Sequence, residues 1–161
     1  MSKKVLFVCS GNIFRSVIAE YCLKKYLKDN EVEGWVVSSS GTSEDASLKY
    51  PYFIERMVEV GLEDVLHHER RHLINEYLNS SDFVIAMARH HKEFIEKIFN
   101  YKNVYLFTEL VGDGIDDVYD IGEREGDTRT KDEVIDDTID YICSKTPKLF
   151  EMLLELRTEK E

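Results

Sequence analysis

The sequence predicts an α/β fold in which helices cover both faces of a four-stranded parallel β-sheet. Two observations lead to this fold class. Four short apolar runs, each typical of a buried strand, are spread along the chain, and segments with apolar residues at helical spacing lie between them. Strands that alternate with helices form βαβ units, which make the strands parallel and place the helices on the faces of the sheet.

The first part of the chain begins this alternation. An apolar run predicts a buried strand over residues 3–8, and residues 16–28 carry apolar side chains at helical spacing. A second strand is expected over residues 35–38. Serine and glycine predict a polar turn over residues 38–42, which should end that strand.

The rest of the chain continues the pattern. Pro51 suits the first position of a helix, which Gly61 should end. We expect a short helix near residues 70–79 and a strand over residues 82–87. The remaining expected elements are a helix over residues 89–99, a strand over residues 103–107, an acidic loop over residues 109–128, and one long C-terminal helix or two helices divided at Pro147.

Length and charge limit the kinds of protein that the chain can be. Its 161 residues suit one domain, residues 1–161, with a substantial core. The formal net charge of −11 argues against nucleic acid and against an anionic membrane surface as partners. No apolar run approaches the ~20 residues that a membrane helix needs, so we expect no membrane partner.

The chain has three cysteines, Cys9, Cys22 and Cys143. Their number is odd, their spacing is wide and no export signal precedes them, so we expect reduced thiols in a cytoplasmic protein. Cys22 falls on the apolar face of the first helix and is expected in the core. Because the chain has no Cys-x-x-Cys pair, we expect no metal site.

The stretch between the first strand and the first helix is the strongest candidate for a site. Gly11 and Asn12 tolerate the positive φ angles of a sharp loop, and backbone N–H groups in such a loop can surround an anion. The start of the helix adds unpaired N–H groups, and the guanidinium of Arg15 can grip two oxygens of a phosphate. The expected phosphate-binding residues are Ser10, Gly11, Asn12, Ile13, Phe14, Arg15 and Ser16.

Cys9 is the candidate nucleophile of this loop. The positive field around it favours the thiolate, and a thiolate facing a bound phosphate is a nucleophile directed at phosphorus. Ser16 can donate a hydrogen bond to that sulfur and stabilise it later as a leaving group. A lone cysteine after an apolar strand is more often a small buried hydrophobic residue. Cysteine, glycine, arginine and serine together, between a strand and a helix, favour the catalytic interpretation instead.

These residues resemble the loop of the low-molecular-weight protein tyrosine phosphatases, which usually reads Cys-x-Gly-Asn-x-Cys-Arg-Ser-Pro. The chain differs at Phe14, where many members carry a second cysteine, and at Val17, where they carry proline. The resemblance implies a flavodoxin-like three-layer fold with strand order 2-1-3-4. It also implies a phosphomonoester hydrolase that acts through a phosphocysteine and uses no metal or other cofactor. The matching positions are Cys9, Gly11, Asn12, Arg15 and Ser16.

Such a reaction needs a carboxyl group that protonates the leaving oxygen and then activates water. The acidic loop offers four aspartates, and composition does not choose among them; it is equally consistent with a solvated acidic turn. Members of the family carry Asp-Pro here, often after Val-x, so the resemblance implies Asp120 as general acid and base. Ile121 takes the place of the proline. The four aspartates are Asp113, Asp116, Asp117 and Asp120.

Two further segments resemble the family. Ser39, in a Ser-Ser-Gly-Thr turn, and His68, in His-Glu-Arg-Arg, match residues that hold the loop asparagine, here Asn12, in its strained conformation. A run of serines is also typical of a plain turn, and all five histidines are consistent with surface positions. The histidines are His67, His68, His72, His90 and His91.

The expected substrate is a phosphotyrosine-containing protein or a small aryl phosphate, with inorganic phosphate as a product. Apolar Ile13 suits a flat aromatic ring, whereas the resemblance associates threonine at this position with phosphoarginine. Glu44, Asp45 and Glu123 make the expected rim acidic, which should disfavour acidic peptides.

Two alternative functions remain open. An arsenate reductase can use the same scaffold, but it needs further cysteines to take over the oxidised sulfur. A phosphate-binding regulatory module with little turnover is the other alternative, because the loop proline is absent and the acid loop is altered.

Overall fold

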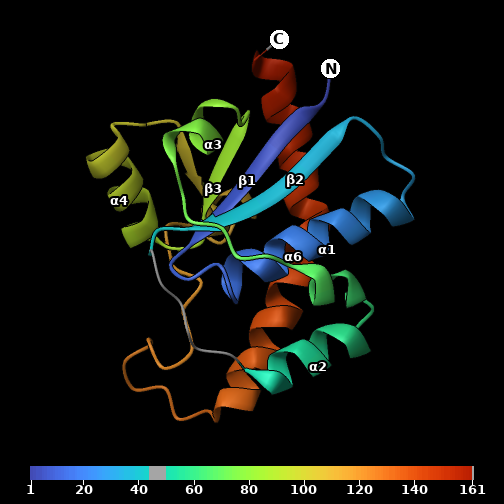
Figure 1. The fold of residues 1–161 in the computed structure, drawn as a ribbon, viewed down its shortest axis with the longest axis vertical. Helices are drawn as coiled ribbons and strands as arrows, with labels where there is room; N and C mark the ends of the chain where they lie inside the picture. The colour runs from blue at the N-terminus through green and yellow to red at the C-terminus, as the bar shows by residue number, and fades with distance from the viewer. Residues whose placement is uncertain (44–49, 161) are drawn as a thin grey trace.

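A computed structural model describes residues 1–43 and 50–160. Its sheet contains four parallel strands in the order β2-β1-β3-β4 (Figure 1). The predicted fold class and strand order are therefore confirmed. The strands are β1 (Lys3–Cys9), β2 (Trp35–Gly41), β3 (Phe83–Ala86) and β4 (Val104–Leu106).

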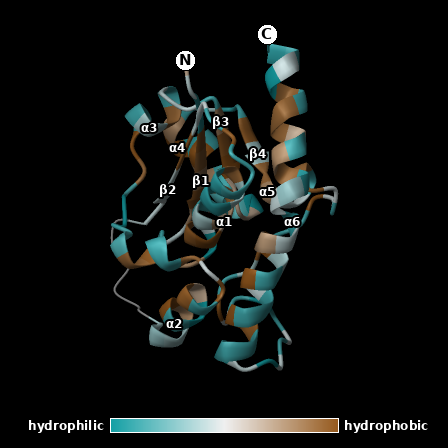
Figure 2. Ribbon diagram, turned by 90° about the vertical axis from the view of Figure 1, so that its right-hand side faces the viewer, coloured by the Kyte–Doolittle hydropathy of each residue, from teal (hydrophilic) through white to brown (hydrophobic). Residues whose placement is uncertain are grey.

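Helices lie on both faces of the sheet, and Figure 2 shows the strands between α3 and α4 on one side and α6 on the other. The helix α1 packs against α6, and α2 also contacts α6. The helical segments are α1 (Arg15–Asp29), α2 (Pro51–Glu59), the 3-10 helix η1 (Glu63–His67), α3 (Asn75–Asn79), α4 (Arg89–Phe99), α5 (Phe107–Leu110) and α6 (Lys131–Lys160).

The central strand β1 divides the core in two because successive side chains of a strand point to opposite faces. Phe7 and Cys9 join the core beneath α1 and α6. Leu6 and Val8 join the core that includes Ile95 of α4. Cys9, the last residue of β1, therefore leads directly from the buried sheet into the loop of residues 10–14, the candidate site.

The expected polar turn over residues 38–42 is wrong in part, because β2 continues to Gly41. Ser39 and Ser40 are fully buried, and the strand pairs in parallel with β1 up to the pair of Cys9 and Gly41. The strand pairing satisfies their backbone groups, and the Ser39 hydroxyl has side-chain partners, whereas Oγ of Ser40 has no hydrogen-bond partner among the described residues.

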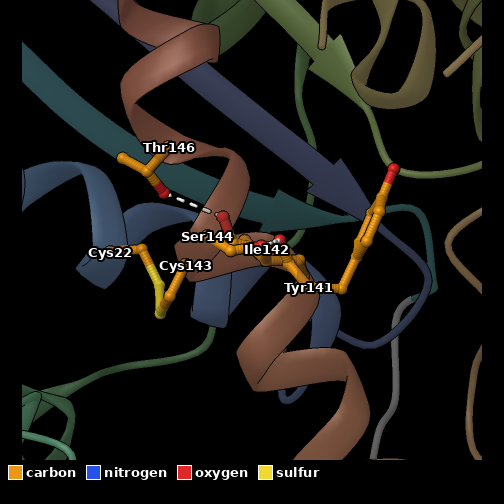
Figure 3. Close-up of a disulfide and its surroundings, with 6 residues drawn as sticks. All are labelled: Cys22, Tyr141, Ile142, Cys143, Ser144 and Thr146. Atoms are coloured by element: carbon orange, nitrogen blue, oxygen red, sulfur yellow. Dashed lines mark hydrogen bonds between the residues drawn. A yellow bond between two sulfur atoms is a disulfide. The ribbon is translucent and has the colours of Figure 1, made fainter. Parts of the chain in front are cut away.

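The C-terminal tail forms one helix rather than two, and α6 continues through Pro147. Proline cannot donate the usual backbone hydrogen bond. Just before it, the hydroxyl of Thr146 donates to the carbonyl of Ile142 at 2.9 Å (Figure 3). None of the described helices is long and apolar enough to cross a membrane.

The expectation of reduced thiols is wrong for two of the three cysteines. Cys22 of α1 and Cys143 of α6 form a disulfide (Figure 3), although 121 positions separate them in the sequence. Their Cα atoms are 5.4 Å apart because the two helices pack side by side, which is an ordinary span for a disulfide. Cys22 is buried as expected, and Cys9 remains a free thiol.

Candidate functional site

The candidate loop spans residues 10–14, between the end of β1 and the start of α1. Asn12 has a φ of 54°, in the left-handed region that asparagine tolerates better than most residues. The loop lies directly against the end of β2. A Cβ atom on Gly41 would lie 2.5 Å from the carbonyl oxygen of Ser10, so only glycine fits there. The backbone N–H of Thr42 donates to the carbonyl of Cys9 at 2.9 Å and fixes the same junction.

Cys9 lies at the base of the loop, and only 2% of its surface is exposed. Its Sγ is 3.0 Å from Oγ of Ser16 in the first turn of α1. That hydroxyl accepts a hydrogen bond from Nδ2 of Asn12 at 3.0 Å. Because Ser16 accepts from Asn12, its own proton remains free to point at the sulfur, which is the arrangement that stabilises a thiolate.

Asn12 connects the loop to the two segments that resemble the phosphatase family, those of Ser39 and His68. Its Nδ2 donates to Oγ of Ser39 at 2.7 Å. Nε2 of His68 lies 3.2 Å from both the carbonyl oxygen and the Oδ1 of Asn12, so this nitrogen donates. The backbone N–H of Arg71 donates to the same Oδ1 at 2.9 Å. Ser39 and His68 therefore both contact Asn12, and these hydrogen bonds support its left-handed conformation.

Glu20 and Tyr21 complete this network, and the sequence did not point to either. Glu20 is only 5% exposed; it accepts from the hydroxyl of Ser39 and pairs with Lys24. Nδ1 of His68 accepts from the hydroxyl of Tyr21 at 3.0 Å. Burial lowers the pKa of His68, although Glu20 opposes that effect. Helical spacing could have indicated Glu20, because residues 16 and 20 lie on the same face of α1.

Arg15 is almost fully buried, with 1% of its surface exposed. Its Nη1 donates to the carbonyl of Val118 at 3.0 Å, and its Nη2 lies 3.4 Å from Oγ of Ser10. Its Nε is buried and, among the described residues, has no hydrogen-bond partner. A buried guanidinium with an unused donor suits an oxyanion, which can accept from the fork.

The acidic loop reaches Arg15 through Val118. The N–H of this buried residue donates to the carbonyl of Met87 at 2.8 Å, which ties the loop to the end of β3. Oδ2 of Asp120 lies 3.5 Å from Nη2 of Arg15, and Oε1 of Glu123 lies 3.6 Å from Nη1. The side chain of Asp120 is 41% exposed, so it borders both the guanidinium and solvent.

The other three aspartates of the loop have different neighbours. Asp117 forms an ion pair with Arg89 at 3.0 Å; burial raises the pKa of this carboxyl, but the bonds from Arg89 lower it more. The hydroxyl of Tyr141 donates to Asp113 and lowers its pKa. Asp116 accepts the N–H of Asp117 at 2.8 Å. Among the four candidates, the structure brings Asp120 to the candidate loop.

The apolar side chains of the candidate loop are those of Ile13 and Phe14. Ile13 is half-buried, whereas Phe14 is buried and meets the ring of Phe53 of α2 edge-on at 5.2 Å. Burial raises the pKa of Tyr50, and the charge of Asp120 raises it further.

Among the histidines, His91 departs furthest from an expected surface position. His91 is fully buried, and its Nε2 lies 2.9 Å from Oγ of Ser10 and 3.4 Å from Nη2 of Arg15. Nothing in the local sequence distinguishes His91 from its exposed neighbour His90. Only the packing of α4 against the loop reveals the contact.

Glu44 and Asp45 of the expected acidic rim lie outside the described residues. Across residues 1–43 and 50–160, no cluster of three or more histidine, cysteine, aspartate or glutamate side chains is arranged to hold a metal ion.

The sequence matches known proteins over most of its length. The family described as low molecular weight phosphotyrosine protein phosphatase matches residues 4–159. A protein-arginine-phosphatase of Bacillus subtilis is 33% identical over 119 residues, which are 72% of this chain and 77% of the relative. A low molecular weight phosphotyrosine protein phosphatase of Sus scrofa is 30% identical over 70% of this chain and 72% of its own.

Two further comparisons bear on the alternatives and on the fold. Arsenate reductase 2 of Staphylococcus haemolyticus is 38% identical over 86 residues, which are 53% of this chain and 60% of that protein. The crystal structure of a YwlE mutant from Bacillus subtilis superposes with a TM-score of 0.76 at 26% identity, over 94% of this chain and 99% of that one.

Proposed function

Because the chain belongs to the low molecular weight phosphotyrosine protein phosphatase family, we propose that it hydrolyses phosphomonoesters through a phosphocysteine intermediate. The observation that carries this proposal is the loop itself. Cys9, Ser16 and the guanidinium of Arg15 converge there, and Nε of Arg15 is buried without a hydrogen-bond partner among the described residues.

In the first step, the thiolate of Cys9 attacks phosphorus in line with the leaving oxygen, and the P–O bond breaks. The backbone amides of residues 10–15 and the fork of Arg15 stabilise the charge on the equatorial oxygens. Asp120, in its protonated form, gives its proton to the leaving oxygen.

In the second step, water attacks the phosphorus of phosphocysteine while the Asp120 carboxylate accepts a proton from it. The S–P bond breaks, inorganic phosphate forms, and the thiolate of Cys9 is restored. The hydroxyl of Ser16, 3.0 Å from the sulfur, stabilises this leaving thiolate. Asn12, Ser39 and His68 act on the loop rather than on the substrate, because their contacts hold its conformation.

The proposed substrate is a phosphotyrosine-containing protein or a small aryl phosphate. Half-buried Ile13 supplies apolar surface for an aromatic leaving group. The Bacillus subtilis relative is named as a protein-arginine-phosphatase. Ile13 favours the aryl ester in this chain, because a branched apolar side chain offers no partner to a guanidinium.

The two alternatives have weaker support. Thiol-based arsenate reduction needs cysteines that exchange with the nucleophile. In this chain Cys22 and Cys143 pair with each other, and Cys9 is the free thiol. A phosphate-binding module without turnover does not need a carboxylate such as Asp120 next to Arg15.

The test is turnover of p-nitrophenyl phosphate and of a phosphotyrosine peptide in the presence of a chelator. We expect wild type to turn over both, Cys9→Ser to lose all measurable rate, and Asp120→Asn to lose about a hundredfold or more in kcat. Asp116→Asn is the matched control, because this exposed aspartate of the same loop does not contact Arg15. Equal rates for wild type and Cys9→Ser would overturn the proposal.

Two broader expectations accompany this function. We propose that residues 1–161 form one domain, in keeping with the family match over residues 4–159. A cytoplasmic location is a further proposal, although the Cys22–Cys143 disulfide removes the argument from reduced thiols. Fractionation of the producing cell with an antibody against the chain tests the location.

A further inference from the structure

The strongest feature that the proposed mechanism leaves unused is His91, in the first turn of α4. Its side chain is fully buried, and its ring contacts two residues of the candidate loop. A buried imidazole must satisfy both nitrogens, and where each nitrogen bonds determines what the ring does.

The backbone around His91 fixes its tautomer. The N–H of Ala88 donates to Nδ1 at 3.1 Å, so Nδ1 is the acceptor and the proton resides on Nε2. Burial, the nearby charge of Arg15 and the neighbouring His90 lower the pKa of His91 to about 2. The ring is therefore neutral, and its Nε2–H donates to Oγ of Ser10 at 2.9 Å.

The hydroxyl of Ser10 then has a defined direction. Its oxygen accepts from Nε2 of His91 and lies 3.4 Å from the donor Nη2 of Arg15. A hydroxyl has two lone pairs and one proton. With both lone pairs facing donors, the proton of Ser10 is left to donate, and Ser10 follows the nucleophile directly in the loop.

We propose that His91 is a positioning residue, which holds the Ser10 hydroxyl so that this hydroxyl donates to the phosphoryl group bound in the loop. The inference rests on the proposed function, because it assigns a role within the same site. It adds a side-chain donor to the backbone amides and to Arg15. With the proton on Nε2, the 3.4 Å contact between this nitrogen and Nη2 of Arg15 joins two donors and is not a hydrogen bond.

Two substitutions at His91 separate this role from a structural one. His91→Asn keeps an acceptor at the position of Nδ1 for the N–H of Ala88 but removes the donor to Ser10. His91→Gln reaches the position of Nε2 and restores that donor. Ser10→Ala removes the hydroxyl itself, and His67→Asn is the matched control at an exposed histidine.

We expect His91→Asn and Ser10→Ala each to lower kcat/KM for p-nitrophenyl phosphate about tenfold, as the loss of one hydrogen bond would. The double variant should lose no more than either single variant, because both changes remove the same donor. His91→Gln should recover most of the rate, and His67→Asn should match wild type. The proposal would be overturned if the double variant lost about a hundredfold in kcat/KM. It would also be overturned if His91→Gln were as impaired as His91→Asn.

A second measurement does not depend on turnover. Inorganic phosphate should protect Cys9 from alkylation by iodoacetate, and the concentration for half protection should rise about tenfold in Ser10→Ala and in His91→Asn. Ser10→Ala tests the idea even if the His91 variants do not fold. Unchanged protection in Ser10→Ala contradicts the role of His91. Absent turnover in wild type with normal protection contradicts the proposed function instead.

Discussion

A single buried cation, Arg15, determines the chemistry of the site. Removing a guanidinium from water is costly, and the cost is offset only by acceptors and opposite charges close to it. Arg15 has the carbonyl of Val118 and the carboxylates of Asp120 and Glu123 around it. The chain is acidic overall, so the guanidinium of Arg15 is a local positive charge in a negative molecule.

The buried histidines make stability depend on pH. The pKa of His91 is lowered to about 2 and that of His68 is also lowered, so the unfolded chain binds more protons than the folded chain below pH 6.5. The contribution of these histidines to the free energy of unfolding should therefore be fully present above pH 6.5 and decrease as the pH falls below that value. Between pH 7.5 and 5, His91 alone should cost about 2 kcal/mol.

Urea unfolding at several pH values measures this effect. His91→Asn should flatten the pH dependence by about that amount, whatever its own stability at pH 7.5, whereas His67→Asn should retain the wild-type slope. A His91→Asn profile parallel to that of wild type would show that His91 titrates normally in the folded chain.

At the level of elements, the loop depends on strands and helices that are remote in sequence. The end of β2 lies against the loop at Gly41, and the segment that carries His68 and Arg71 holds Asn12. The helix α4 supplies His91. The loop conformation is thus enforced from three sides, and this rigidity allows Asn12 to keep a positive φ.

The disulfide between α1 and α6 should stabilise the fold. Cys22 lies seven residues beyond Arg15, roughly two helical turns along α1, so the bond supports the helix that begins in the site. Reduction, or Cys22→Ser with Cys143→Ser, should lower the free energy of unfolding by about 2–4 kcal/mol and Tm by about 5–15 °C.

Calorimetry with and without dithiothreitol checks this expectation. Cys9→Ser should respond to the reductant as wild type does, whereas the double serine variant should not respond. An identical Tm for oxidised and reduced wild type, with the bond verified by mass spectrometry, would contradict it.

On the scale of the whole molecule, the net charge of −11 should select among phosphopeptides. Peptides with basic flanks should be attracted and acidic ones repelled, giving about a tenfold difference in kcat/KM at low ionic strength. Salt at about 500 mM should remove most of the difference, because it shortens the Debye length to a few ångströms. Aryl phosphates that lack charged flanking groups serve as controls. A peptide preference that does not change with salt would contradict the electrostatic origin.

Much of the fold was predictable because it depends on local patterns. The patterns involve residues that are close in sequence: apolar runs over β1 and β3, and helical spacing in α1 and α4. The boundary of β2 was misplaced because serines signal a turn locally, whereas pairing with β1 carries the strand to Gly41. The helix near residues 70–79 is shorter than expected and covers Asn75–Asn79.

The sequence alone determined the order of the elements and the nucleophile loop, because strand, loop and helix follow one another there without a gap. It also singled out Ser39, His68 and Asp120 through their resemblance to a family. Only the tertiary structure brought Asp120 and Glu123 to Arg15, paired Cys22 with Cys143, and buried His91 against Ser10. Those contacts join residues far apart in the chain, and their distances follow from how the helices pack on the sheet.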